Sequence, residues 1–400
     1  MALSTAVQCR SSPGSRQPPT CASVSRKPLG GRRPLPQQGG VPSAVRLSLS
    51  PAPDIAGLAD AWRALEARSE FSFFQSWTWV GCRAEARFPA AVLLRAERDG
   101  ETVALALCNR RRGAVWLNES GDPALDAAYV EHNGVLRARG AEALLPACLH
   151  ALLGTSWRGR RLRLSGVDAA HGSAARAAGA VRLLRQSAAP WIDFSALGTR
   201  DFLAGLSANT RYQLRRSDRA YAAAGPVRVD RAATLAEAEE FLDALAALHQ
   251  ATWTARGSPG AFANPSFRVF HRALLARALP RGEAELLRVA AGGTVIGYLY
   301  NFRHRGRVLA YQSGFDYAAA GLHQKPGLTC HHAAITLARR EGAVAYDFLA
   351  GGDRYKTSFA NATTALFWLD VAPRWSPLGV VYRVRQGLSA DREGKNFIHR

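Results

Sequence analysis

The sequence predicts a mixed α/β fold of the α+β type, in which mostly antiparallel sheets are flanked by helices. Between residues 46 and 372, stretches with helical spacing of apolar residues alternate with short strand-like stretches. Each half of this region also contains strand-like stretches joined by tight turns, which is typical of an antiparallel meander. With 48% apolar and 21% charged residues, the composition is that of a globular protein rather than a membrane or fully disordered chain.

A chain of 400 residues exceeds the usual size of one domain, so two domains and a tail are expected. Residues 1–44 are rich in Ser, Pro, Gly and Arg and lack periodic apolar spacing, so they are predicted to be disordered. An organelle transit peptide is an alternative that the density of Pro and Gly disfavours. We expect domains over 45–190 and 191–375 and a C-terminal extension over 376–400.

The first half is predicted to contain a helix, a three-stranded meander, a second helix and two further strands. Apolar spacing predicts the first helix over 55–69, and Asp99-Gly100 marks the turn between the first two strands. The remaining elements are strands over 91–111 and 114–120, a helix over 139–153, a strand over 160–167 and a strand near 191.

The second domain is predicted to repeat this arrangement of helices and a central meander, which suggests duplication of one fold. Thr234 is a suitable N-cap for a strongly periodic helix that ends before Gly257. Turns at Gly292-Gly293 and Arg305-Gly306 divide a three-stranded meander over 284–315. The other elements are a helical stretch over 198–225, a strand over 227–232, helices over 265–279 and 327–341, and strands over 343–349 and 364–373.

The formal charge is +21, and the first 50 residues contribute seven Lys or Arg without any Asp or Glu. Nearly all the positive charge is Arg, since Lys occurs only at 27, 325, 356 and 395. A basic surface favours anionic partners such as phosphates and nucleotides. A biased coding composition explains the charge equally well, so the charge alone does not predict a nucleic-acid partner.

The six cysteines include no C-x-x-C pair and no Cys/His spacing of the zinc-finger kind, so neither a disulfide framework nor a metal site is predicted. No apolar run approaches the roughly 18 residues that a membrane span needs. The N-terminus has no apolar stretch of signal-peptide length. We therefore expect a cytoplasmic protein without a membrane span.

A turn suited to phosphate lies where the second meander ends and the next helix begins, with the sequence QKPGLT at 324–329. The first amide N–H groups of a helix lack partners within the helix, and the helix dipole adds positive charge there. A glycine also lets a phosphate approach the backbone. The candidate pyrophosphate residues are Gln324, Lys325, Gly327, Leu328 and Thr329. An ordinary Pro-Gly turn before a helix explains the same residues without a ligand.

Polar and aromatic residues gather after the following strand, in the stretch AVAYDFLAGGDRYK at 343–356. Strand ends next to a meander are where open sheets form their crevices. A tyrosine can donate a proton and a carboxylate can accept one, so Asp347 and Tyr355 are candidate catalytic residues and Lys356 is a candidate substrate-binding residue. A solvated loop is the alternative. His331, on the helix between the two motifs, shares a face with apolar residues and is interpreted as packed.

Two helical faces carry candidate substrate-binding residues. Arg215 shares a face with Arg211 and Arg219 and could hold an anionic acceptor, although an ordinary exposed face has the same pattern. His249 and Trp253 lie one turn apart on the periodic helix and could contact an acceptor. The edge of a hydrophobic core explains that second pair as well.

Taken in order, several stretches resemble the CelD/FemAB-like branch of the GNAT acyltransferase superfamily, also called the cellulose-biosynthesis-protein CelD type acetyltransferase domain. The resemblance covers most of residues 50–372. Its most specific marks are KPGL at 325–328 and DFLAGGDRYKTSF at 347–359. The others are FFQSWTWV, NTRYQLRRSDR, LHQATWTARG, GYLYNF and LAYQSGFD.

The resemblance implies two tandem GNAT-like domains and an N-acyltransferase that uses acetyl-CoA or another acyl-CoA, without a metal. In this superfamily, backbone amides of a loop patterned Q/R-x-x-G-x-G/A hold the CoA pyrophosphate. Gln324 and Gly327 match that pattern, whereas Thr329 replaces its small last residue. The pattern D-F-x-x-G-x-x-x-Y-K also includes Gly351 among the site residues.

The expected acceptor is a small-molecule amine or a sugar nucleotide, in polysaccharide or cell-envelope precursor metabolism. One alternative that the resemblance implies is a FemAB-like transferase that uses aminoacyl-tRNA, in which case tRNA is the one nucleic acid expected. A second alternative is a non-catalytic protein that binds anions or nucleic acid on the same fold.

Overall fold

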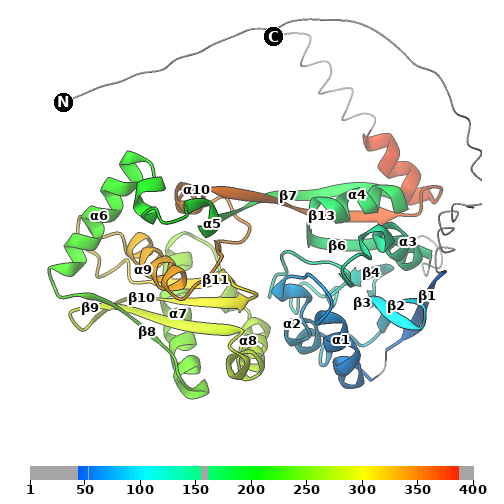
Figure 1. Cartoon of the computed structure of the whole chain (residues 1–400), viewed down its shortest axis with the longest axis horizontal. Helices are drawn as coiled ribbons and strands as arrows, with labels where there is room; N and C mark the ends of the chain where they lie inside the picture. Colours follow the sequence, from blue (N-terminus) through cyan, green and yellow to red (C-terminus); the bar gives the residue numbers. More distant parts are fainter. Residues whose placement is uncertain (1–43, 53, 155–160, 387–400) are drawn as a thin grey trace, which may run out of the picture. The chain divides into compact units, whose positions relative to one another are not determined.

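The computed structural model describes residues 44–52, 54–154 and 161–386 (Figure 1). Contacts group the chain from Ala44 onward into one compact unit. Among the described residues, thirteen strands form a single mixed sheet that helices flank. The predicted mixed α/β class is therefore confirmed. Apart from Ala44, the predicted tail lies outside the described residues, as does the extension beyond 386.

The order of the strands places a meander at each end of the sheet. Neighbouring strands run β1-β2-β3-β4-β6-β13-β7-β12-β11-β10-β9-β8, with β5 (Leu136–Arg137) beside β3. The N-terminal meander is β1 (Val45–Pro51), β2 (Ala91–Arg98), β3 (Glu101–Arg111) and β4 (Ala114–Leu117). The C-terminal meander is β8 (Val227–Arg231), β9 (Ala284–Ala291), β10 (Thr294–His304) and β11 (Arg307–Phe315).

The predicted hairpin turns are confirmed. Asp99 and Gly100 join β2 to β3 with φ of 54° and 80°, and Gly292-Gly293 and Arg305-Gly306 also have positive φ. Two-residue hairpins need this conformation because its twist matches that of the flanking strands, and Asp-Gly and Gly-Gly adopt it readily.

The helices also follow the apolar spacing, with one break. Thr234 caps α7 and accepts a hydrogen bond from the Glu237 N–H, as predicted. The helical stretch predicted over 198–225 is interrupted, because Ser207 is extended and caps α6 through the Thr210 N–H. The labelled helices are α1 (Ala59–Glu66), α2 (Trp77–Ala84), α3 (Leu145–Gly154), α4 (Ala169–Ala178), α5 (Phe194–Leu197), α6 (Ala208–Ala222), α7 (Leu235–Ala255), α8 (Pro265–Ala278), α9 (Pro326–Arg340) and α10 (Arg354–Phe359), and residues 377–386 are helical as well. Within the described ranges, no helix combines the length and apolar character that crossing a membrane requires.

Two long strands connect the halves of the sheet. Figure 1 shows β7 (Ala180–Asp193) alongside β13 (Ala362–Ala372), and the two pair in antiparallel register along their whole length. β13 also pairs with β6 (Arg161–Val167), and β7 pairs with β12 (Ala345–Asp347). The prediction near residue 191 covers only the end of β7, since the exposed, Arg-containing middle of that strand lacks an apolar pattern.

Each half contains one pair of parallel strands that opens into a fork. In the N-terminal half, β4 pairs with β6 from Ala114↔Arg161 to Trp116↔Arg163. In the C-terminal half, β11 pairs with β12 from Arg307↔Ala345 to Leu309↔Asp347. Beyond these pairs β6 and β11 continue without the parallel partner. We call these places the N-terminal fork and the C-terminal fork. Their repetition agrees with two tandem domains of one fold.

The chain itself closes the N-terminal fork. Asn133 forms a parallel bridge with Val167 of β6, and its side-chain amide donates to the Leu117 carbonyl at 3.1 Å. The Asn118 amide donates in turn to Asn133 Oδ1 at 2.8 Å, and both asparagines are buried. Residues 118–134, which we call the plug segment, therefore join β4 to the far end of β6.

Candidate active site

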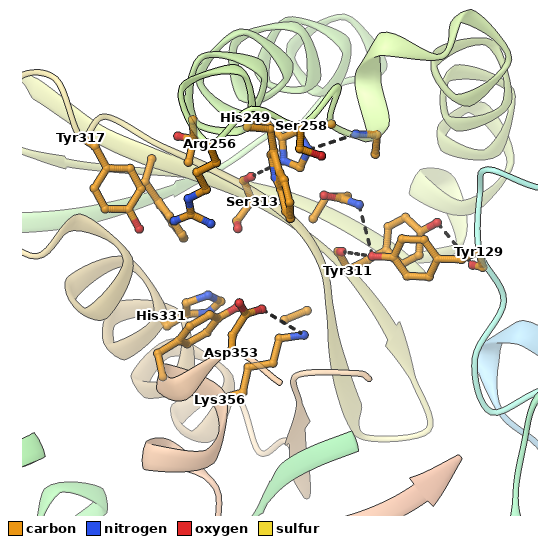
Figure 2. Close-up of a pocket in the computed structure, with 18 of the residues that line it drawn as sticks. Tyr129, His249, Arg256, Ser258, Tyr311, Ser313, Tyr317, His331, Asp353 and Lys356 are labelled. Carbon is orange, nitrogen blue, oxygen red and sulfur yellow. Dashed lines mark hydrogen bonds and ion pairs between the residues drawn. The ribbon is translucent and has the colours of Figure 1, made fainter. Parts of the chain in front are cut away.

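The C-terminal fork holds a cavity of about 510 Å³ (Figure 2). One wall is the edge of β11 beyond Leu309, where pairing with β12 has ended. Figure 2 shows His249 and Arg256, from α7 and its C-cap, on one side of the cavity. Asp353 and Lys356, at the start of α10, lie on the other side. Unlike the N-terminal fork, this fork is thus open to a ligand.

A bulge shapes the β11 wall. The register between β11 and β10 shifts between Tyr300 and Asn301, which leaves Tyr311 without an opposite residue. The Tyr311 ring stacks on Tyr129 of the plug segment, with ring centroids 4.9 Å apart, and the Tyr129 hydroxyl donates to the Tyr311 carbonyl at 3.0 Å. Bulges next to active sites re-aim side chains. Because Tyr129 lines the cavity, the N-terminal half contributes to this site.

His249 and Trp253, both predicted to contact substrate, line the cavity. His249 Nδ1 donates to the Ser313 carbonyl at 3.2 Å, and its Nε2 accepts from the Ala261 N–H at 3.4 Å. Burial lowers the pKa of His249, so the ring is neutral at pH 7 with both nitrogens engaged. The exposed Trp253 lies beside it and carries the Arg256 guanidinium over its ring at 5.7 Å. His249 thus supports the wall, while Trp253 and Arg256 face a ligand.

Tyr355 and His331 form part of the opposite wall. Their rings are stacked, with centroids 4.9 Å apart and planes 21° apart. Burial, followed by the charge of Lys356, lowers the pKa of His331 to about 3, so the buried ring is neutral. His331 is therefore packed, as predicted. Burial and the charge of Asp353 raise the pKa of Tyr355, so its phenol keeps its proton at neutral pH and can donate it.

The ammonium of Lys356 lies at the edge of the same wall. Its Nζ donates to the Ala350 carbonyl at 2.9 Å and is 4.0 Å from Asp353 Oδ2. Burial lowers the pKa of Lys356, and the carboxylates of Glu131 and Asp353 oppose that shift. Lys356 and Arg256 therefore place positive charge on two sides of the cavity, and Asp353 supplies a carboxylate.

Asp347 does not line this cavity. Its carboxylate faces a second cavity of about 300 Å³, where it lies 3.2 Å from His132 Nε2 and 3.4 Å from the Arg307 guanidinium. It also accepts the Leu349 N–H at 2.8 Å. Burial alone would raise the pKa of Asp347, but His132, the Leu349 amide and Arg307 together hold it below its usual range. The two predicted catalytic residues, Asp347 and Tyr355, are thus not brought together.

The predicted pyrophosphate turn lies at the start of α9, but most of its side chains are engaged within the fold. Gln324 Oε1 accepts the Gly321 N–H at 2.7 Å. Leu328 packs against a hydrophobic cluster, and the buried Thr329 hydroxyl donates to Asp218 at 2.8 Å. The main-chain N–H groups of these three residues are also engaged, since Gln324 donates to the Gly321 carbonyl and Leu328 and Thr329 donate to the Lys325 carbonyl.

Lys325 and Gly327 differ from the other candidate residues of this turn. The Lys325 side chain is exposed. Pro326, which lies between them and begins α9, has no N–H. At Gly327, an added Cβ would lie 3.1 Å from the Tyr317 hydroxyl and 3.3 Å from the Phe315 ring. Since Phe315 and Tyr317 both line the cavity, the first turn of α9 lies directly behind its wall.

The predicted arginine face is not a single surface. Arg211 is turned back toward the carbonyls of Leu203 and Leu206, at 3.3 and 3.4 Å. Arg215 is exposed on α6 and is not among the residues that line the cavity. Arg219 lines a different hollow between α6, α9 and the edge strand β8.

Among the described residues, those that line this cavity include no cysteine. Cys82, Cys108, Cys148 and Cys330 are buried free thiols. Across the part of the chain that the structure describes, no group of three or more His, Cys, Asp or Glu residues is placed to hold a metal ion.

Comparison with known proteins agrees with this geometry. Residues 208–357 match a family described as the acetyltransferase (GNAT) domain. The second half of the chain therefore carries a GNAT-type domain. Its matched segment runs from α6 through the C-terminal fork to Thr357 and so includes most of the cavity wall. A search of curated proteins found no match.

Solved structures that resemble most of the chain have low sequence identity. FemX is 11% identical, with a TM-score of 0.53 over 78% of this chain and 95% of its own. The C-terminal domain of a putative lysylphosphatidylglycerol synthetase from Agrobacterium fabrum is 10% identical, with a TM-score of 0.52 over 83% and 96%. L-PGS from Bacillus licheniformis is 11% identical, with a TM-score of 0.52 over 82% and 96%. At this identity the similarity is one of fold.

Sequence reasoning missed the contribution of the plug segment to the GNAT-type domain. Tyr129 and Glu131 lie 182 and 219 residues before their partners Tyr311 and Ala350, and no motif around them signals this. Tyr311, Gln312 and Ser313 could have been found, because they lie within LAYQSGFD, one of the stretches that carry the family resemblance.

Proposed function

We propose that the chain is an N-acyltransferase of the CelD/FemAB-like branch, which transfers an acyl group, with acetyl the expected one, from acyl-CoA to an amine. The open C-terminal fork supports this proposal above all. Its cavity follows the edge of β11 and reaches residues that contact the first turn of α9. An extended thioester needs an open strand edge, and its pyrophosphate needs a helix start.

The donor would enter with its phosphates at the start of α9. There Lys325 supplies an exposed positive charge, and Gly327 leaves room beside Tyr317. Gln324, Leu328 and Thr329 would hold the shape of this turn through their own hydrogen bonds. The acyl end would then extend along β11 toward Tyr355 and Lys356.

The transfer forms a carbon–nitrogen bond and breaks the carbon–sulfur bond of the thioester. The attacking amine loses one proton, and the departing thiolate gains one. Tyr355, whose phenol is protonated at neutral pH, can supply the proton to sulfur. Asp353, the carboxylate in the cavity, can accept the proton of the amine directly or through water. The catalytic role predicted for Asp347 would then be a supporting one, through its pairing with His132 at the end of β12.

The acceptor would lie between Trp253 and Lys356. Trp253 and Arg256 offer an aromatic face and a guanidinium, and Lys356 offers an ammonium on the other side. This combination suits an amine that also carries an anionic group, such as a sugar nucleotide from polysaccharide or cell-envelope precursor metabolism. The exposed Arg215 lies away from this cavity and would act only on a larger acceptor.

A donor of another kind, aminoacyl-tRNA, is the second candidate, as the resemblance to FemAB-like proteins implies. The formal charge of +21 favours it, because a basic surface attracts a polyanion. The same charge favours a protein that binds anions without catalysis. A titration with both kinds of donor separates the first two candidates, and a transfer assay separates them from the third.

Calorimetric titration of the full chain with acetyl-CoA, longer acyl-CoAs and charged tRNA tests the proposal. We expect an acyl-CoA to bind and Gly327→Glu to abolish that binding, since a carboxylate would occupy the phosphate position. Leu322→Glu is the matched control, because it adds the same charge at an exposed position of the same loop. Absence of acyl-CoA binding at millimolar concentration would falsify the acyl-CoA donor, and binding of charged tRNA alone would support the second candidate.

A further inference from the structure

The main chain of one residue in the cavity wall, Ala350, is bound on both sides by oppositely charged side chains. The Ala350 N–H donates to Glu131 Oε2 at 2.5 Å, and the Ala350 carbonyl accepts from Lys356 Nζ at 2.9 Å. Ala350 and Lys356 line the cavity, whereas Glu131 lies behind them. Contacts therefore connect Glu131 of the plug segment, through Ala350, to the Lys356 ammonium.

Both charges are buried. Glu131 is 4% exposed and Lys356 is 9% exposed, so both ions have lost most of their hydration. The two side chains bind opposite sides of Ala350 rather than each other, and the charge of Glu131 partly offsets the desolvation of Lys356. Asp353, the other carboxylate near Lys356, has a side chain that is 59% exposed and 4.0 Å away, so water screens it.

We infer that Glu131, carried by the N-terminal half, is a positioning residue that fixes the Lys356 ammonium at the cavity wall and maintains its charge, through the backbone of Ala350, whose N–H binds one side chain and whose carbonyl binds the other. This inference rests on the proposed function for its purpose, because a charged Lys356 is what would hold an anionic group of the donor or acceptor. The plug segment thus closes one fork and completes the other.

Other charged groups also face Lys356 and affect its protonation. Asp353 on α10 and Asp347 on β12 stabilise its charge, whereas Arg185 on β7 opposes it. His331 on α9 is neutral and adds no charge. Glu131 differs from the two aspartates because Asp353 is exposed and Asp347 is paired with His132 and Arg307.

The chain contains only four lysines, Lys27, Lys325, Lys356 and Lys395, which makes a direct measurement feasible. Full-length protein labelled with [ε-¹³C]lysine gives one NMR signal per lysine, and the signal missing from Lys356→Arg identifies Lys356. Titration with pH then reports the protonation of Lys356 without any substrate. In Glu131→Gln, which keeps the size of the side chain but removes its charge, we expect the midpoint of Lys356 to fall by about one pH unit or more.

Two further variants keep the inference open to refutation. Asp353→Asn should lower the midpoint less than Glu131→Gln does, because Asp353 is exposed. Glu131→Asp keeps the charge and should leave the midpoint near that of the wild type, even if Glu131→Gln does not fold. An unchanged midpoint in Glu131→Gln, a larger fall in Asp353→Asn, or a large fall in Glu131→Asp would overturn the inference. Failure of acyl-CoA to bind would refute the proposed function but leave these midpoints unaffected.

Discussion

The His132 imidazole lies 3.2 Å from the Asp347 carboxylate, Nε2 to Oδ2, and so connects the plug segment to the end of β12. His132 holds this position with φ of 48°, in the left-handed region that few non-glycine residues adopt. Backbone strain of this kind persists only where the surroundings stabilise it. The pair with Asp347 and the hydrogen bond that Ser72 Oγ donates to the His132 carbonyl at 2.6 Å provide this stabilisation.

The pair makes stability depend on pH. The pKa of Asp347 is lowered, so its contribution is present above about pH 4 and is lost as pH falls. Burial opposes protonation of His132, but Asp347 raises its pKa overall, so its contribution is present below about pH 6.5 and is lost as pH rises through the folded-state value. His132→Asn, which tolerates the same φ, should therefore reduce the free energy of unfolding by about 2 kcal/mol at pH 6 and by less at pH 9.

Urea unfolding at the two pH values measures this difference. His150→Asn, at an exposed position of α3, should change stability by less than about 0.5 kcal/mol at either pH. An equal loss in His132→Asn at pH 6 and pH 9 would show that the pair contributes packing and no charge.

The closed N-terminal fork should depend on its buried asparagine pair. Asn133→Ala removes the acceptor of Asn118 and the donor to the Leu117 carbonyl, so it should destabilise the protein by about 2–3 kcal/mol. Asn209→Ala, at an exposed position of α6, should have little effect. Chemical denaturation of both variants tests this, and equal stability would mean that the two hydrogen bonds do not hold the plug segment.

The start of α9 should contribute charge to donor binding. Lys325→Gln should weaken acetyl-CoA binding by about 3- to 10-fold at low salt and by less at high salt, because the exposed ammonium is screened. Arg340→Gln, which removes a positive charge at the other end of the same helix, is the control. Calorimetry at two salt concentrations compares acetyl-CoA binding by the two variants. If both substitutions weaken binding equally, the overall charge of the protein attracts the donor and Lys325 has no special role.

Tyr355 should matter for transfer more than for folding. Tyr355→Phe keeps the ring on His331 but removes the proton donor, so it should lower kcat by about 100-fold without changing stability. Tyr355→Ala should lose both activity and stability. A thiol reagent that detects CoA release, used with a panel of amines, measures the effect on kcat. Thermal unfolding measures the effect on stability. Full activity in Tyr355→Phe would remove Tyr355 from the proton path.

Much of the fold could be predicted because its signals are local. The turns at Asp99-Gly100 and Gly292-Gly293 and the cap at Thr234 each depend on a few neighbouring residues, and all three are as predicted. β7 could not be predicted along its length, because its middle is exposed and its stability comes from pairing with β13, about 180 residues away.

The site could be predicted only where one stretch of sequence forms a wall. Tyr355 and Lys356 line the cavity together, and so do His249 and Trp253, since each pair lies on a single helix. Asp347 faces the other cavity because it is the last residue of β12, where alternate side chains point to opposite faces of the sheet. The partners of Lys356 and Asp347 in the plug segment depend on tertiary pairing that no periodicity encodes.

The closed N-terminal fork has a consequence for stoichiometry. A duplicated fold offers two equivalent places for a donor, but Asn133 already pairs with β6 where the first would open. To admit a ligand there, the chain would have to release the Asn118–Asn133 bond and with it the segment that carries Tyr129 and Glu131 to the second fork. A donor should therefore saturate the protein at one molecule per chain. A second donor molecule could bind only if the cavity that holds the first were disrupted.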